Sequence, residues 1–158
     1  MKKLTVLFAA LFVFSMSNAQ SAMEEIDFFQ SIFGMEKKAA VMEFVKPSEE
    51  DKTAFWELYD AYEVERKALG KTRLALLNQY ANDYSSMTDE KADALMKQVL
   101  SLRKSSDKLL TKYFKKVKKA TSPMVATQFF QMESYIQSSI RAGILEAIPF
   151  VGEMDTDG

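Results

Sequence analysis

The side chains in this chain that could do chemistry are limited to carboxylates, amines, phenols and thioethers. Its 158 residues include neither histidine nor cysteine. That excludes histidine-activated nucleophiles, imidazole ligation of zinc or copper, and thiol or disulfide chemistry. Glu57, Asp60 and Glu63 recur at every third position and could line a divalent-cation site of oxygen ligands. The same spacing is typical of a solvated helix face, which we favour. We expect no catalytic residue, cofactor or metal site, and no enzymatic activity.

Aromatic residues form the most unusual cluster in the sequence. Its members are Phe55, Trp56, Tyr59 and Tyr62 in one segment and Phe129 and Phe130 in another. On a helix, Phe55 and Tyr59 share a face, whereas Trp56 points about 100° away from Phe55. Core packing accounts for such residues, but tyrosine and tryptophan are also favoured in binding surfaces. The candidate partner-binding residues are Trp56, Tyr59, Tyr62 and Phe130.

Charged residues are segregated along the chain. Residues 49–65 are rich in Asp and Glu, whereas residues 103–119 hold seven lysines, one arginine and a single aspartate. In an antiparallel pair of helices the two blocks would lie side by side and select the pairing. The basic block could instead attract anionic headgroups or acidic polypeptides. The net charge is −1 for the whole sequence and −3 without Lys2 and Lys3 of the N-terminal segment, because 19 basic residues then face 22 acidic ones. That sign argues against nucleic-acid binding.

Hydrophobic periodicity predicts helices and no strands. Residues 22–45 should form one or two short helices, interrupted near Gly34 and ended by Pro47. A long helix is expected over residues 49–84, with Ser48 as its N-cap and a bend at Gly70, because glycine lowers helix stability by about 1 kcal/mol. Its apolar stripe would be Phe55, Tyr59, Tyr62, Leu69, Leu76, Leu77, Tyr80 and Tyr84.

Two further helices are predicted after a turn at residues 85–87. Thr88 should be the N-cap of the first, Pro123 the first residue of the second, and Pro149 the residue that ends it. The expected stripes are Ala92, Leu95, Val99, Leu102, Ser106, Leu109, Tyr113 and Val117, then Phe129, Met132, Ile136, Ile140 and Ile144. The fold predicted is all-α, a bent antiparallel helical hairpin with additional packed helices, three to four in total.

The N-terminal residues have the three-part layout of a secretory signal. Lys2 and Lys3 precede an apolar run over residues 4–14, and a small polar stretch then leads to Ala19. The run is shorter than the roughly 20 residues of a membrane-spanning helix. We expect cleavage after Ala19, export to the periplasm or another extracytoplasmic space, and no stable membrane insertion afterwards. An uncleaved anchor is the alternative. A single helical domain over 20–150 and a flexible acidic tail over 151–158 should follow the signal.

Two predicted helix starts carry a family resemblance. The segments Ser48-Glu49-Glu50-Asp51 and Met87-Thr88-Asp89-Glu90-Lys91, behind a leader, resemble the Spy/CpxP-like family of small exported helical proteins. The mark of that family is Leu-Thr-x-x-Gln at helix starts. In the second segment Met87-Thr88 stands for Leu-Thr and Lys91 replaces the glutamine. In the first, Pro47, Ser48 and Asp51 occupy the places of the leucine, threonine and glutamine, so all three defining positions differ. Residues 55–62, 126–131 and 147–149 are also similar to a group of uncharacterised exported helical proteins.

The resemblance covers residues 45–150 and implies a bent four-helix protein, often a cradle-shaped dimer, that holds unfolded clients or senses envelope stress. We therefore expect an ATP-independent holding chaperone or stress-sensor module that binds unfolded or envelope proteins on an amphipathic helical surface. A homodimer is compatible with this expectation. The alternative is a structural or regulatory protein of the cell envelope with one specific protein partner.

The leader predicts the terminus of the exported product. Mass spectrometry of the protein recovered after export should find Gln20 at or near its N-terminus, and that protein should remain in solution without detergent. An exported product that still begins at Met1 or Lys2 would contradict cleavage.

Overall fold

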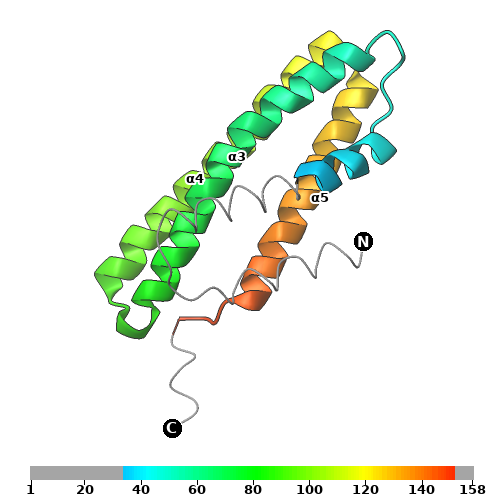
Figure 1. Cartoon of the computed structure of the whole chain (residues 1–158). Helices are drawn as coiled ribbons and strands as arrows, with labels where there is room; N and C mark the ends of the chain where they lie inside the picture. Colours follow the sequence, from blue (N-terminus) through cyan, green and yellow to red (C-terminus); the bar gives the residue numbers. More distant parts are fainter. Residues whose placement is uncertain (1–33, 152–158) are drawn as a thin grey trace. The chain divides into compact units, whose positions relative to one another are not determined.

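The computed structural model describes residues 34–151, of which 87% are helical, and no strand occurs among them (Figure 1). The predicted all-α fold is confirmed. The signal segment, residues 22–33 of the first predicted helical segment, and most of the acidic tail lie outside the described residues.

The described part of the chain contains four helices joined by short connections. They are residues 34–44, α3 (Lys52–Asp83), α4 (Asp89–Ala120) and α5 (Pro123–Ala147), and the 3-10 turn η2 (Tyr84–Ser86) connects α3 to α4. The first of these helices includes Gly34 and ends before Pro47. Contacts divide the described residues into two compact units, 42–132 and 34–41 with 133–151, which we describe separately.

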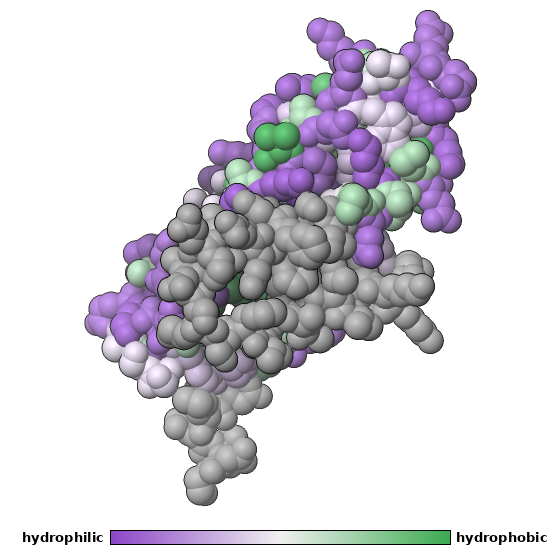
Figure 2. Space-filling view, viewed as in Figure 1, coloured by the Kyte–Doolittle hydropathy of each residue, from purple (hydrophilic) through white to green (hydrophobic). Residues whose placement is uncertain are grey.

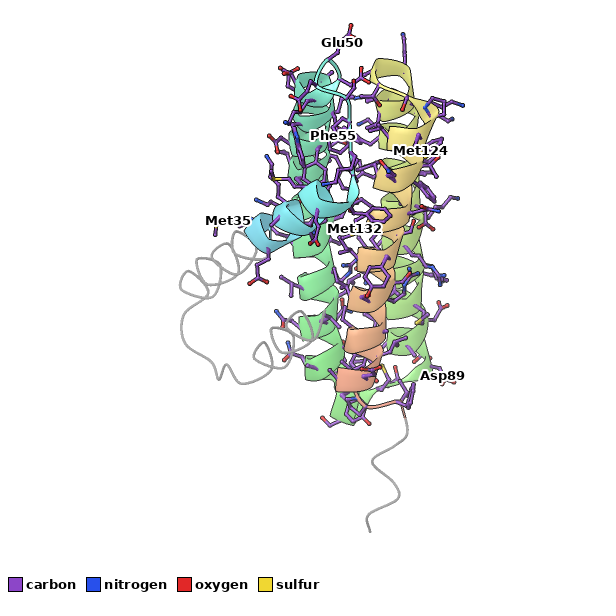
Figure 3. The ribbon with its side chains drawn as sticks, turned by 90° about the vertical axis from the view of Figure 1, so that its right-hand side faces the viewer. Met35, Glu50, Phe55, Asp89, Met124 and Met132 are labelled. Carbon is purple, nitrogen blue, oxygen red and sulfur yellow. The ribbon has the colours of Figure 1, made fainter. Side chains whose placement is uncertain are left out.

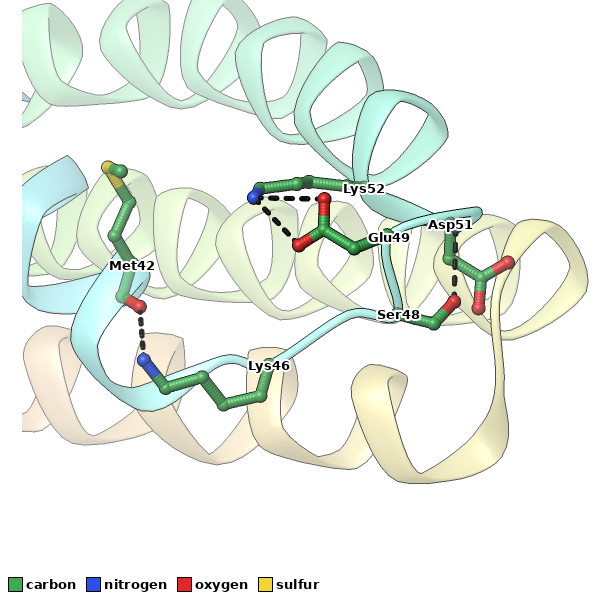
Figure 4. Close-up of polar contacts among 6 residues, drawn as sticks. All are labelled: Met42, Lys46, Ser48, Glu49, Asp51 and Lys52. Carbon is green, nitrogen blue, oxygen red and sulfur yellow. Dashed lines mark hydrogen bonds and ion pairs between the residues drawn. The ribbon is translucent and has the colours of Figure 1, made fainter.

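Helix α3 begins one turn later than predicted. The Ser48 hydroxyl accepts a hydrogen bond of 3.2 Å from the Asp51 backbone N–H, so Ser48 stabilises the turn at residues 49–51 and does not cap the helix itself. The Lys52 ammonium closes this turn with an ion pair of 3.1 Å to Glu49 (Figure 4). From Lys52 the helix continues through Gly70 as a single element.

The predicted starts of the other two helices are confirmed. Thr88 has extended backbone, and its hydroxyl accepts a hydrogen bond of 3.3 Å from the Lys91 N–H. Helix α5 begins at Pro123, and the Ser122 hydroxyl accepts from the Val125 N–H at 3.2 Å. Each hydroxyl satisfies a backbone donor that has no partner inside its helix.

Helices α3 and α4 form an antiparallel hairpin and lie side by side along their length (Figure 1). Glu50 and Asp89 mark its opposite ends (Figure 3). Near the η2 turn, Lys91 pairs with Asp83 at 3.0 Å. The half of the hairpin next to the turn is held by a buried leucine cluster. It comprises Leu76, Leu95 and Leu102, against which Leu69, Tyr80 and Met87 pack.

The other half of the hairpin is filled by aromatic rings. Tyr62 of α3 contacts Tyr113 of α4 with ring centroids 5.4 Å apart, and Phe129 of α5 packs edge-on to Tyr62 at 5.3 Å. Phe55 also meets the ring of Phe129, with ring centroids 6.4 Å apart. Edge-to-face pairs of this kind stabilise a core beyond the area they bury. The start of α5 is thereby packed on the hairpin.

The buried stripe of α4 agrees with the sequence prediction at six positions. Leu95, Leu102, Ser106, Leu109, Tyr113 and Val117 are all buried. Leu110 is buried as well, whereas Val99 is exposed. The Ser106 hydroxyl donates a hydrogen bond of 3.0 Å to the Leu102 carbonyl, so this buried polar group has a partner.

The unit formed by residues 34–41 and 133–151 contains a buried ion pair. The Lys37 ammonium lies 2.8 Å from Glu133 Oε1, and both side chains are almost completely excluded from solvent. Val41, Ile136 and Ile140 of the same unit are also buried. The pair joins the helix at residues 34–44 to α5 within this unit.

Leu102 and Lys104 test which face of α4 is inward. Leu102→Asp should bury an unpaired charge in the leucine cluster, cost about 3 kcal/mol or more, and lower the melting temperature by roughly 10 °C. Lys104→Asp changes an exposed side chain and should leave the melting temperature within a few degrees. Thermal melts followed by circular dichroism compare the two, and similar melting temperatures would refute the assignment of the faces.

Candidate functional site

The four aromatic residues predicted to bind a partner do not form one surface. Tyr59 and Tyr62 are fully buried, so neither side chain is presented to a partner in this conformation. Trp56 is half-buried and packs edge-on to Phe55 and Tyr59, at 4.9 and 5.4 Å. Phe130 is exposed.

The location of Phe130 differs from that of the other three. Its ring packs edge-on to Phe114 of α4 at 5.7 Å, and 39% of the residue remains accessible. The core-packing interpretation therefore accounts for Tyr59 and Tyr62, while Phe130 remains available at the edge between α4 and α5.

The three carboxylates at three-residue spacing do not converge. Glu57 and Asp60 are exposed, whereas Glu63 is buried and accepts a hydrogen bond of 2.8 Å from the Arg66 Nε. Among residues 34–151, no group of three or more acidic side chains could hold a metal ion.

One polar constellation links α3 to α4. The Glu65 carboxylate accepts hydrogen bonds from the Lys112 ammonium, at 2.7 and 2.8 Å, and from the Tyr113 hydroxyl at 2.8 Å. The Lys116 ammonium lies over the Tyr113 ring, 4.8 Å from its centroid. The hydrogen bond from Lys112, then that from Tyr113, lowers the pKa of Glu65. Burial and, secondarily, the hydrogen bond to Glu65 raise the pKa of Tyr113 to about 12.

Most of the basic block of α4 faces outward without an ionic partner. Six of its cations form no ion pair or side-chain hydrogen bond within the described part of the chain, and all six are exposed. We call them the α4 basic face: Arg103, Lys104, Lys108, Lys115, Lys118 and Lys119. Within residues 34–151, the ion pairing expected between the acidic block at residues 49–65 and the basic block at residues 103–119 is thus limited to the Lys112–Glu65 pair.

Exposed apolar side chains precede the α4 basic face on the same helix. Met96, Val99 and Leu100 are neighbours at spacings of three and four residues, and Met96 and Leu100 are 50% and 57% accessible. A shallow depression continues from Leu100 along α4. Its lining is Leu100, Arg103, Lys104, Asp107, Lys108, Thr111, Lys112 and Lys115. In Figure 2 the visible surface of the hairpin end that carries the α4 C-terminus is mostly hydrophilic, with small separate hydrophobic patches.

Met96, like Met87, Met124 and Met132, is an adaptable thioether that suits varied apolar contacts, but the sequence prediction did not use its spacing relative to Leu100. Met96 and Leu100 are four residues apart and flank the predicted apolar stripe on its outer side. Val99 was placed in that stripe, although the structure exposes it. An apolar pair outside the inward stripe marks a second, outward apolar patch.

Comparisons with protein-family models, curated proteins and solved structures gave no match for this chain. Among the helices within residues 34–151, none combines the length and hydrophobicity of a membrane-spanning segment. The outward face of α4 is the surface on which exposed apolar and basic side chains meet.

The Glu65–Tyr113 contact predicts an alkaline loss of stability. The pKa of Tyr113 in the folded chain, about 12, lies above the usual value of about 10 that applies to the unfolded chain. The contribution of the protonated phenol to the free energy of unfolding is therefore complete below pH ~10 and is lost as the pH rises to ~12. Denaturant unfolding of the parent between pH 9 and 12 should show a steeper fall than that of Tyr113→Phe, which lacks the ionising group.

The same contact predicts how the phenol responds to its neighbour. In Glu65→Gln the pKa of Tyr113 should fall but stay above that of a free tyrosine, because burial is its larger cause. Ultraviolet difference titration against Tyr113→Phe isolates this residue. An unchanged pKa of Tyr113 in Glu65→Gln would contradict the hydrogen bond.

Proposed function

We propose that this chain is an extracytoplasmic, ATP-independent holding chaperone or stress-sensor module that binds non-native polypeptides on the outward face of α4. The observation that carries the proposal is the exposed apolar group of Met96, Val99 and Leu100, which continues directly into the α4 basic face. This surface is amphipathic along a single rigid helix. It offers contacts for both the apolar and the charged side chains of an unfolded segment.

The chemistry of the apolar group suits a partner that is not unique. Methionine is unbranched and polarizable, so Met96 can adapt to different apolar side chains. Leu100 is more than half accessible, and its burial under a bound segment would remove apolar surface from water, at about 25 cal/mol per Å². Phe130, at the edge between α4 and α5, would extend the contact. Trp56, Tyr59 and Tyr62 would support the surface as part of the core.

The alternative is a structural or regulatory protein that docks one envelope component on the same face. The two functions differ in promiscuity, because a holding chaperone should protect several unrelated clients and a dedicated partner protein should protect none. The amphipathic face supports either function, and its methionine favours the first.

A matched pair of leucine variants tests the proposal. Leu100 and Leu145 are 57% and 53% accessible; Leu100 lies in the interior of α4 and Leu145 in the last turn of α5. Replacement by serine should therefore lower helix stability by no more than about 0.5 kcal/mol at either position. We expect the parent to suppress the aggregation of several chemically denatured, unrelated proteins. Leu100→Ser should be several-fold less effective, and Leu145→Ser should match the parent.

Thermal melts of both variants control for unfolding, and each should lie within a few degrees of the parent. No protection of any client by the parent would exclude the chaperone function and leave the single-partner alternative. Equal losses in the two variants would show that the outward face of α4 is not the binding surface.

A further inference from the structure

The number and position of cations on α4 exceed what the fold itself requires. Helix-dipole stabilisation acts within the last turn and so accounts for Lys118 and Lys119. It does not account for Arg103, Lys104 or Lys108, which lie more than three turns before the C-terminus of α4. These three also lack an ionic partner within residues 34–151.

Pairing with the acidic block at residues 49–65 does not explain the α4 basic face either. Glu49 pairs with Lys52 and Glu63 with Arg66, each within its own segment. Glu65 pairs with Lys112, which is not part of the α4 basic face. A surface that serves solubility alone mixes both signs of charge, whereas residues 103–119 contain a single acidic residue, Asp107.

We propose that the α4 basic face binds acidic polypeptide segments, so that the clients selected are those with an apolar stretch next to a run of carboxylates. This inference rests on the proposed function and names its substrate class. The apolar stretch would lie against Met96 and Leu100, and the carboxylates against Arg103, Lys104, Lys108 and Lys115.

The shape of the surface favours a linear partner over a membrane plane. The depression along α4 is lined by residues of that helix alone among those described. From Arg103 to Lys119 the α4 basic face is about 24 Å long at 1.5 Å per residue. Roughly seven residues of extended polypeptide span that distance. A bilayer would instead contact a broad area that includes neighbouring elements.

The side-chain types favour variable carboxylates over one fixed anion. Five of the six residues of the α4 basic face are lysines, whose flexible ammonium groups act as point charges without the planar, two-pronged geometry of arginine. Such groups accept carboxylates at many positions. Because all six are exposed, the attraction should raise association rates and weaken with salt.

Binding of two labelled peptides measures this selectivity. The peptides share the same apolar half and differ in carrying a run of glutamates or a run of lysines, and fluorescence anisotropy follows their binding to the full chain. At about 50 mM salt, the glutamate peptide should bind about tenfold more tightly than the lysine peptide, and at about 500 mM most of the difference should disappear.

A charge-matched pair of triple variants locates the site. Replacement of Lys104, Lys108 and Lys115 by glutamine should weaken binding of the glutamate peptide about tenfold. The control replaces Lys52, Lys67 and Lys71 of α3 by glutamine, which removes the same charge from another helix and should change binding less than twofold. Circular dichroism melts of both triples should match the parent.

Several results would overturn the inference. Equal binding of the two peptides, or equal effects of the two triples, would exclude a selective α4 basic face. Anionic vesicles or duplex DNA that bind as tightly as the glutamate peptide, through the same three lysines, would make the ligand a polyanion other than polypeptide.

A parent that protects acidic and basic clients equally would refute this inference while the proposed function stands. Selective peptide binding without protection of any client would support the acidic partner and exclude the chaperone.

Discussion

The narrow apolar stripe of α4 is the constraint on which the rest of the hairpin depends. The chain has no cysteine, so no disulfide holds α4 against its neighbours and its position depends mainly on packing. A fully buried leucine contributes about 1.5–3 kcal/mol, and Leu95, Leu102, Leu109 and Leu110 are all buried. Because the stripe occupies one side of the helix, the core imposes no residue type on the outward side. The cations and exposed apolar residues found there therefore need a separate explanation.

The two halves of the hairpin use different packing chemistry, and this difference helps to fix their register. Leucines meet near the η2 turn, whereas Tyr62, Tyr113 and Phe129 meet toward the other end. If α4 slid along α3, aromatic rings would face positions now occupied by leucines, whose side chains have a different volume. A close-packed core does not accommodate such a change easily. The same slide would separate Glu65 from both Lys112 and the Tyr113 hydroxyl. Packing and the polar contact thus select one alignment.

Sequence periodicity and capping chemistry predicted most of the hairpin because both are local properties. Thr88 and Pro123 marked helix starts through their own backbone preferences, and the inward residues of α4 followed from spacing alone. The start of α3 was misplaced because the Ser48 hydroxyl has the same chemistry whether it caps a turn or a helix. Val99 was misplaced because its spacing brings it close to the stripe, and exposure there depends on what covers the helix.

Which aromatic and charged side chains are exposed was harder to predict, because exposure depends on the rotation of each helix about its axis. Tyr59 and Tyr62 are amphipathic side chains that suit a surface or a core equally well, and the approach of Phe129 from α5 decides in favour of the core. Likewise, the segregation of charge along the chain indicated an acidic block and a basic block that lie side by side. An ion pair also requires the two side chains to point toward each other, which depends on how each helix is rotated about its axis. Only one lysine of the block meets a carboxylate of α3 within the described residues.

The ion pair between Lys37 and Glu133 shows the same limit in a buried setting. Neither residue is distinctive in the sequence, and long separation along the chain conceals their contact. Burial of two charges carries a large desolvation penalty, so such a pair is weak evidence for stability. Its effect lies in geometry, because a shift of the helix at residues 34–44 by one turn along α5 would pull the two charges apart inside the core. Apolar neighbours such as Ile136 and Ile140 could tolerate that shift, whereas the charges could not. The pair therefore restricts this unit to one docking position.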